Sequence, residues 1–73
     1  MSKLNENLRN IRIDRRYMLR DIAEITGVSV QAVHQWETGE TNTPIDKIVK
    51  IAKFYGITVD ELISEGPHDE GRA

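Results

Sequence analysis

Residues 19–36 read LRDIAEITGVSVQAVHQW, and this stretch decides the fold of the chain. The small or apolar side chains that recur at helical spacing in it are Ile22, Ala23 and Thr26, followed by Val33 and Trp36. Each half therefore predicts a short helix with one buried side. Between the halves, Gly27 supplies the positive φ of a sharp turn, and Ser29 stands where the second helix needs a cap. The stretch predicts two helices joined by a tight turn, and the second has a polar outer face.

A helix is also predicted before this pair. Leu4, Leu8 and Ile11 fall at spacings of four and three, which predicts an amphipathic helix over residues 3–15 with Ser2 as its cap. The next helix begins near Leu19, where Met18 occupies the cap position without a side-chain oxygen to accept the free amides. Asp21 and Glu24 suit the positive end of that helix.

Two more helices are predicted after the pair. Thr43 as cap, Pro44 in the first turn and Asp46 three residues after the cap predict a helix that runs to about Tyr55. A capping box at residues 58–61 then opens a short helix that carries Leu62 and Ile63. Gly66 and Pro67 end it. The expected architecture is all-α, with five short helices in one domain over residues 1–65 and a flexible acidic tail over residues 66–73.

The composition limits the classes of function. The chain has 73 residues, of which 38% are hydrophobic and 30% charged, as in small globular domains. No apolar run approaches the ~20 residues that span a bilayer and no signal segment is evident, so a cytoplasmic protein is expected. There is no cysteine, and the two histidines, His34 and His68, are far apart, so no metal site is expected. An enzyme, a cofactor and a small-molecule ligand are not expected either, because no carboxylate pair, activated nucleophile or phosphate-binding glycine loop is present.

Charge is distributed unevenly along the chain. The formal net charge is −2, but residues 1–20 contain six basic side chains against two acidic ones. Residues 54–73 contain one basic side chain against five acidic ones. This asymmetry predicts one basic face and an acidic far end, and hence a modest electrostatic attraction to phosphates. The alternative, ordinary solvated surface, is the favoured interpretation of the acidic tail.

Taken together, the motifs resemble the Cro and repressor-type (Xre family) helix-turn-helix DNA-binding domains of phages and bacterial transcription regulators. The resemblance covers about residues 4–63. The matching segments are the first-helix pattern Leu4, Leu8, Ile11 and Arg12, the segment IAEITGVS, the segment VHQWE followed by Gly39, then Pro44, and finally IVKIAKFYGITVDELI. The resemblance implies a five-helix lambda-repressor-like domain that binds double-stranded DNA, and a bacterial or phage-encoded homodimeric repressor or Cro-like protein.

In this family the second helix of the motif lies in the major groove. The positions that would contact bases are Ser29, Val30, Gln31, Ala32 and Gln35. A glutamine amide both donates and accepts, which matches an adenine edge, and Val30 or Ala32 suits a thymine methyl. The side chains or amides expected at the DNA backbone are Arg9, Arg16, Arg20, His34, Thr38, Asn42 and Thr43. For His34, a solvated role is the open alternative.

Arg12 lies beside the apolar stripe of the first helix, so it needs a partner if it is partly buried, and Glu37 is the expected one. The resemblance implies the same structural ion pair. Two features depart from the family pattern. Met18 and Leu19 are apolar where relatives contact phosphate, and residues 40–43 are not basic, so weak non-specific binding and a shallow salt dependence are expected.

Additional apolar residues suggest association. Those at positions that relatives often fill with polar groups are Ile13, Ile25, Val49, Phe54 and Ile63. The resemblance places the dimer interface at Phe54, Ile57, Val59 and Ile63. A twofold dimer would set its recognition helices ~34 Å apart and bind a palindromic operator. The alternative function is a protein-interaction module on the same fold, an antitoxin or antirepressor, supported by Met18, Leu19, Ile25 and the acidic C-terminal end.

Overall fold

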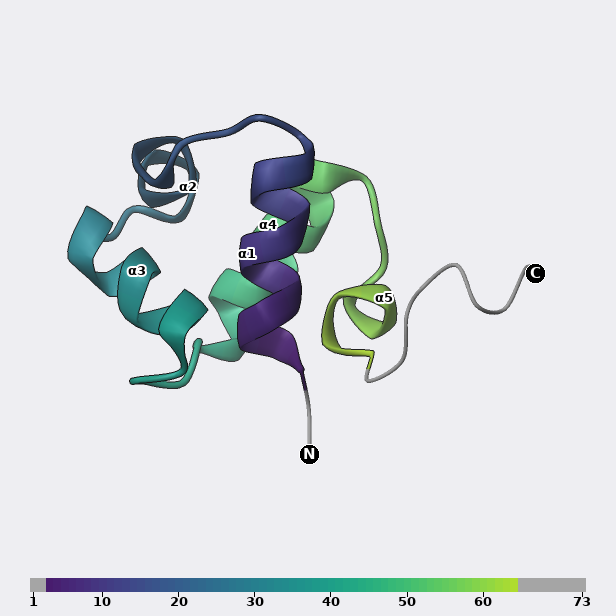
Figure 1. The fold of residues 1–73 in the computed structure, drawn as a ribbon. Helices are drawn as coiled ribbons and strands as arrows, with labels where there is room; N and C mark the ends of the chain where they lie inside the picture. The colour runs from purple at the N-terminus through teal and green to yellow at the C-terminus, as the bar shows by residue number, and fades with distance from the viewer. Residues whose placement is uncertain (1–2, 65–73) are drawn as a thin grey trace.

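The computed structural model describes residues 3–64, and these form five helices and no strand. Their bounds are α1 Leu4–Asp14, α2 Leu19–Thr26, α3 Val30–Thr38, α4 Ile45–Tyr55 and α5 Val59–Ile63. Helix α1 crosses in front of α4, with α2 and α3 on one side and α5 on the other (Figure 1). The predicted all-α architecture and the helix-turn-helix are confirmed. Ser2 and the tail over residues 66–73 lie outside the described residues.

Every helix contributes to one apolar core. Its buried members are Leu8, Ile22, Ala23, Val33, Trp36, Ile48, Ile51, Ala52, Tyr55 and Leu62. The small polar side chain of Thr26 is also buried, and its hydroxyl donates to the carbonyl of Ile22 at 2.7 Å. The inward-facing positions predicted from helical spacing are therefore confirmed. Within residues 3–64, no helix is both long and apolar enough to cross a bilayer.

The turn between α2 and α3 has the expected geometry. Gly27 has φ 74°, a left-handed conformation that side chains with a Cβ adopt only at a cost, and its N–H donates to the carbonyl of Ala23 at 2.8 Å. Ser29 then caps α3, since its Oγ accepts from the N–H of Ala32 at 3.1 Å. These contacts fix the angle at which α3 leaves α2.

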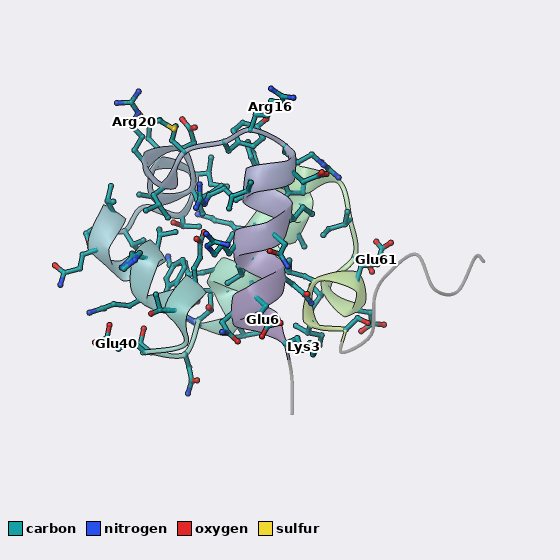
Figure 2. All side chains as sticks on the ribbon, in the orientation of Figure 1. Lys3, Glu6, Arg16, Arg20, Glu40 and Glu61 are labelled. Carbon is teal, nitrogen blue, oxygen red and sulfur yellow. The ribbon has the colours of Figure 1, made fainter. Side chains whose placement is uncertain are left out.

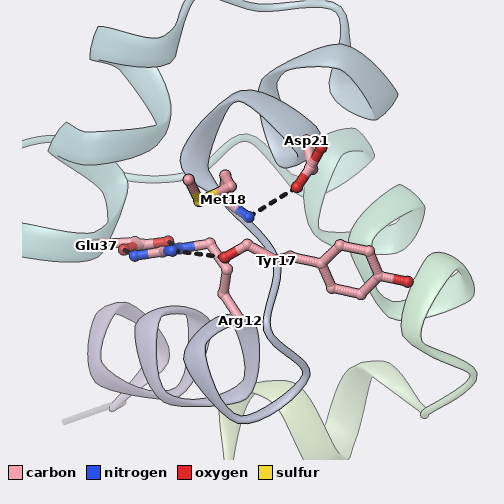
Figure 3. A network of polar contacts seen from close by, with 5 residues as sticks. All are labelled: Arg12, Tyr17, Met18, Asp21 and Glu37. Carbon is pink, nitrogen blue, oxygen red and sulfur yellow. Dashed lines mark hydrogen bonds and ion pairs between the residues drawn. The ribbon is translucent and has the colours of Figure 1, made fainter.

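At the start of α2, one backbone N–H has a hydrogen-bond partner that the sequence analysis did not predict. The carboxylate of Asp21 accepts a hydrogen bond from the backbone N–H of Met18 at 2.7 Å (Figure 3). This contact is one half of a capping box, and the thioether of Met18 cannot supply the oxygen of the other half. At α5 both halves form, because Thr58 Oγ1 accepts from the N–H of Glu61 at 3.0 Å and Glu61 Oε1 accepts from the N–H of Thr58 at 2.9 Å.

The predicted start of α4 is wrong by one residue. Pro44, not Thr43, holds the N-cap position, with φ −61° and ψ 146°, and α4 begins at Ile45. With ψ 146° Pro44 is extended and lies before the first turn, and the side chain of Thr43 is buried instead of capping. The carbonyl of Pro44 accepts from the N–H groups of Lys47 and Ile48 at 3.0 Å.

Ile25 also differs from its prediction. The sequence places it among the exposed apolar residues, but it is half-buried and packs against the core. By contrast, Ile13, Val49, Phe54 and Ile63 are exposed over 36–47% of their surface.

Candidate nucleic-acid interface

The outer side of α3 carries no carboxylate, lysine or arginine. Val30, Gln31 and His34 are exposed, while Ala32 and Gln35 are half-buried at its edge. The opposite side buries Val33, Trp36 and Glu37 in the core. Among the five described helices, α3 alone has no acidic residue in its first turn; the other four carry Glu6, Asp21, Asp46, and Asp60 with Glu61. A carboxylate at this position would interact favourably with the helix dipole but would repel phosphates. Its absence leaves the start of α3 compatible with a polyanion such as DNA.

The Arg12–Glu37 ion pair holds α3 in place, as the sequence predicted. Arg12 donates from Nε to Glu37 Oε2 at 2.8 Å and from Nη2 to Oε1 at 3.1 Å. Its third nitrogen, Nη1, donates to the carbonyl of Tyr17 at 2.9 Å, so one guanidinium joins α1, α3 and the α1–α2 turn (Figure 3). The hydrogen bonds from Arg12 to Glu37 raise the pKa of the guanidinium, while burial lowers it. The side chains of Arg12 and Glu37 are only 13% and 4% exposed.

Arg15 has a structural role that the sequence did not reveal. Its Nη1 donates to the carbonyl of Tyr55 at 3.1 Å, at the end of α4, and its guanidinium carbon lies 5.5 Å from the centre of the Tyr55 ring. A cation at a helix C-terminus satisfies both the free carbonyl and the dipole. The basic N-terminal segment is thus partly used inside the molecule, and residue spacing gave no sign of the contact with α4, 40 positions away.

Three other arginines remain available to a partner. Arg9, Arg16 and Arg20 are exposed, and their side chains make no ion pair or hydrogen bond within residues 3–64. Arg16 and Arg20 project from the end of the molecule that carries the α1–α2 turn. Glu40 lies at the opposite end, just after the C-terminus of α3 (Figure 2). The positive charge therefore lies near the N-terminal half of the motif.

One open groove is bordered by three of the predicted contact residues. It has a volume of 490 Å³ and is lined by α2 and by the first residues of the next helix, including Arg20, Ser29 and Val30. A backbone-contact candidate and two base-contact candidates therefore border the same space. Asp21 and Glu24 line it too, so the groove itself is not uniformly positive.

The remaining residues near the predicted DNA backbone contacts differ in how exposed their side chains are. Thr38 and Asn42 are exposed, but the Thr38 hydroxyl already donates to the carbonyl of Gln35 at 3.2 Å. Thr43 is buried, which leaves its backbone as the part able to reach DNA. Met18 is 56% exposed, whereas Leu19 packs against the core. The described residues contain no cluster of three His, Cys, Asp or Glu side chains suited to a metal ion.

Comparisons with known proteins agree with this geometry. A helix-turn-helix family model matches residues 8–62. The chain is 39% identical over 61 residues to the HTH-type transcriptional regulator DdrOP3 of Deinococcus deserti, which covers 84% of this chain and 47% of that protein. It is 28% identical over 61 residues to the cryptic phage CTXphi transcriptional repressor RstR of Vibrio cholerae, covering 84% of this chain and 55% of the repressor. The chain spans about half the length of these two relatives.

A solved structure shows the same arrangement of helices. A transcriptional regulator from Listeria innocua superposes with a TM-score of 0.85 at 25% identity, covering 92% of this chain and 63% of that one. The family match covers the whole helix-turn-helix and the helices that support it. The chain belongs to the Cro/C1-type helix-turn-helix family of transcriptional regulators.

Proposed function

We propose that this protein is a sequence-specific DNA-binding regulator of the phage or mobile-element repressor type, which inserts α3 into the major groove of a palindromic operator. The observation that carries the proposal is the hydrogen-bonding outer side of α3, held in place by the Arg12–Glu37 pair. A rigid helix with polar side chains on its free face suits direct contact with base edges.

The base contacts are assigned to the start and middle of α3. Gln31 is exposed and Gln35 is half-buried beside it, so two amides are available to the N6 and N7 edge of adenine. Ser29, Val30 and Ala32 complete the base-contacting set. Phosphate contacts are assigned to Arg9, Arg16 and Arg20, with His34, Thr38, Asn42 and the backbone near Thr43 as further contacts.

The protein is proposed to act as a homodimer, because a twofold dimer presents two α3 helices to the two halves of a palindrome. The repressor RstR, one of its relatives, supports a repressive role. A repressor of this kind acts by occupying its operator, so its own concentration sets the output.

The alternative is a protein-interaction module on the same fold. Its support in the sequence is the acidic C-terminal end together with Met18, Leu19 and Ile25, and of these three residues only Met18 is exposed in the structure. Because the other two pack against the core, the structure favours DNA over a protein partner at this end of the motif.

Selection of bound sequences from a random DNA pool tests the proposal. We expect enrichment of a palindromic motif with adenine or thymine at the positions facing Gln31 and Gln35. Recovery of no common sequence, together with stoichiometric capture of one protein in a parallel pull-down, would favour the interaction module instead.

A further inference from the structure

One side of α4 exposes apolar surface that no described part of the molecule covers. Ile45 is 67% exposed and Val49 is 40% exposed. They are four residues apart, so they are neighbours on the same side of the helix. The inward-facing side of α4 buries Ile48, Ile51, Ala52 and Tyr55 in the core, and Ile45 lies at the border of that side, two turns before Ala52. We call the exposed set formed by Ile45, Asp46, Val49 and Lys53 the α4 outer stripe.

Two of the four apolar residues predicted to form the dimer interface pack against the core, and the other two stay exposed. The ring of Phe54 lies with its centre 5.0 Å from that of Tyr17 and 5.3 Å from that of Tyr55. Ile57 and Val59 pack against the core. Phe54 follows Val49 by five residues, about 140° around the helix, so it does not share the α4 outer stripe. Phe54 and Ile63 are still 39% and 36% exposed, so they remain available to a second copy beside the α4 outer stripe.

The α4 outer stripe carries one carboxylate and one ammonium that can pair between two copies, and the exposed Lys50 lies beside them. Asp46 lies in the first turn of α4 and Lys53 in the last, seven residues apart and on the same side as Val49. In an antiparallel pair of α4 helices with the twofold axis beside Val49, residue 46 of one copy lies within one residue of the level of Lys53 in the other. Each carboxylate then faces an ammonium, and this contact occurs twice. A parallel arrangement would instead oppose like charges and like helix dipoles.

We infer that the α4 outer stripe is the contact between two copies of this chain, with their α4 helices antiparallel. Val49 meets its own copy at the axis, Ile45 covers the flank, and the two Asp46–Lys53 contacts set the register. Asp46 also lies 3.4 Å from Lys47 of its own chain, but its side chain is 70% exposed and remains accessible. With two apolar side chains per copy, the association is expected to be weak without DNA. The inference rests on the homodimer of the proposed function and gives it a definite interface.

Charge exchange tests the interface directly. The variants are Asp46→Lys, Lys53→Asp and the double variant, each studied by sedimentation over a range of protein concentrations without DNA. Each single change puts like charges together at both contacts, so we expect self-association to weaken about tenfold, while the double change restores it. Within one chain, both single changes place the wrong charge at an end of α4. An effect on helix stability alone would therefore add in the double variant, and recovery would identify contact between copies.

A second pair of variants guards against misfolding. Val49→Glu is expected to abolish association, while Ile13→Glu, at a 47% exposed position on α1, leaves it unchanged. Circular dichroism confirms the fold of each. A wild-type protein that stays monomeric at all concentrations, or a double variant that is weaker than both single variants, would overturn the inference. Binding to a single operator half-site at high protein concentration reports on α3 alone, so failure of the interface is distinguishable from failure of DNA recognition.

Discussion

Glu37 is a buried carboxylate whose charge is matched by one guanidinium. It is 6% exposed, and both of its oxygens accept from Arg12. Removing the carboxylate leaves the partly buried charge of Arg12 without its partner, which costs about 3–5 kcal/mol. We therefore expect Glu37→Ala to lower the free energy of urea-induced unfolding by about that amount. The exposed Glu24→Ala is the control, and a loss in it equal to that of Glu37→Ala would contradict a special role for the pair.

Tyr55 gives the fold a pH dependence. Burial raises the pKa of its phenol from 10.0 to about 12, and its hydroxyl has no hydrogen-bond partner within residues 3–64. The folded state keeps the proton to higher pH than the unfolded state, so the stabilisation is complete below pH 10 and is lost as pH rises towards 12. We expect the stability of the wild type to fall more steeply over this range than that of Tyr55→Phe. Parallel curves for the two proteins would show that Tyr55 ionises alike in both states.

Individual residues differ in how well the sequence predicts their role. The Arg12–Glu37 pair was predictable, because a charge beside an apolar stripe requires a partner and a carboxylate follows the second helix of the motif. The contact of Arg15 with the end of α4 was not, because it joins positions 40 residues apart in sequence and depends on how α1 crosses α4. Contacts between distant elements follow from packing geometry, which residue spacing does not contain.

The C-terminus of α1 is closed by a strained residue. Arg16 has φ 65°, and its N–H donates to the carbonyl of Ile13 at 3.0 Å. A side chain in the left-handed region costs about 1–2 kcal/mol, so Arg16→Gly is expected to raise the free energy of unfolding by up to about 1 kcal/mol after the entropy cost of glycine. The matched control is Arg9→Gly, in the middle of α1, which should lower it by about 1 kcal/mol. If both variants lose stability equally, the strain at Arg16 is absent.

Helix boundaries could be predicted where a capping or helix-ending residue sets them within a few positions. Gly27 and Ser29 end and begin their helices as expected, because a positive φ and a capping oxygen act within a few residues. At α4 the same rules predicted a start that is one residue too early. The sequence supports Thr43 as cap, but the structure buries its side chain and lets Pro44 hold the cap position. The burial of the Thr43 side chain against the rest of the molecule therefore accompanies the shift of the helix start to Ile45.

At the level of the whole molecule, the free positive charge is small. Arg12 and Arg15 make hydrogen bonds inside the fold, which leaves Arg9, Arg16 and Arg20 as the arginines of the basic segment whose side chains have no partner within residues 3–64. Removing one phosphate-binding side chain reduces the slope of log binding constant against log salt by about 1. We expect Arg20→Ala to reduce that slope and to weaken binding to all sequences alike. Lys50→Ala, at an exposed position on α4, should leave it unchanged; a slope that does not respond to Arg20 would exclude it from the phosphate contacts.

The family and the helix-turn-helix could be predicted from the sequence, because the motif and its supporting apolar positions are spaced along one chain in a known order. The surface proposed for a second copy could be predicted only in part, because Val49 was expected to be exposed and Ile45 was not. It depends on which apolar residues the fold leaves uncovered, and the exposure of Ile45 is evident only once α4 is packed.

Base recognition by Gln31 and Gln35 of α3 is the step on which the proposed regulator depends. A binding cycle tests it by combining Gln31→Ala with replacement of the facing A·T pair by G·C in the selected operator, all four affinities being measured at one salt concentration. We expect the wild type to lose about 1–3 kcal/mol on the base change and Gln31→Ala to lose much less, since that variant already lacks the contact. Equal losses in the two proteins would contradict recognition through Gln31, and so would a wild type that binds both sequences alike.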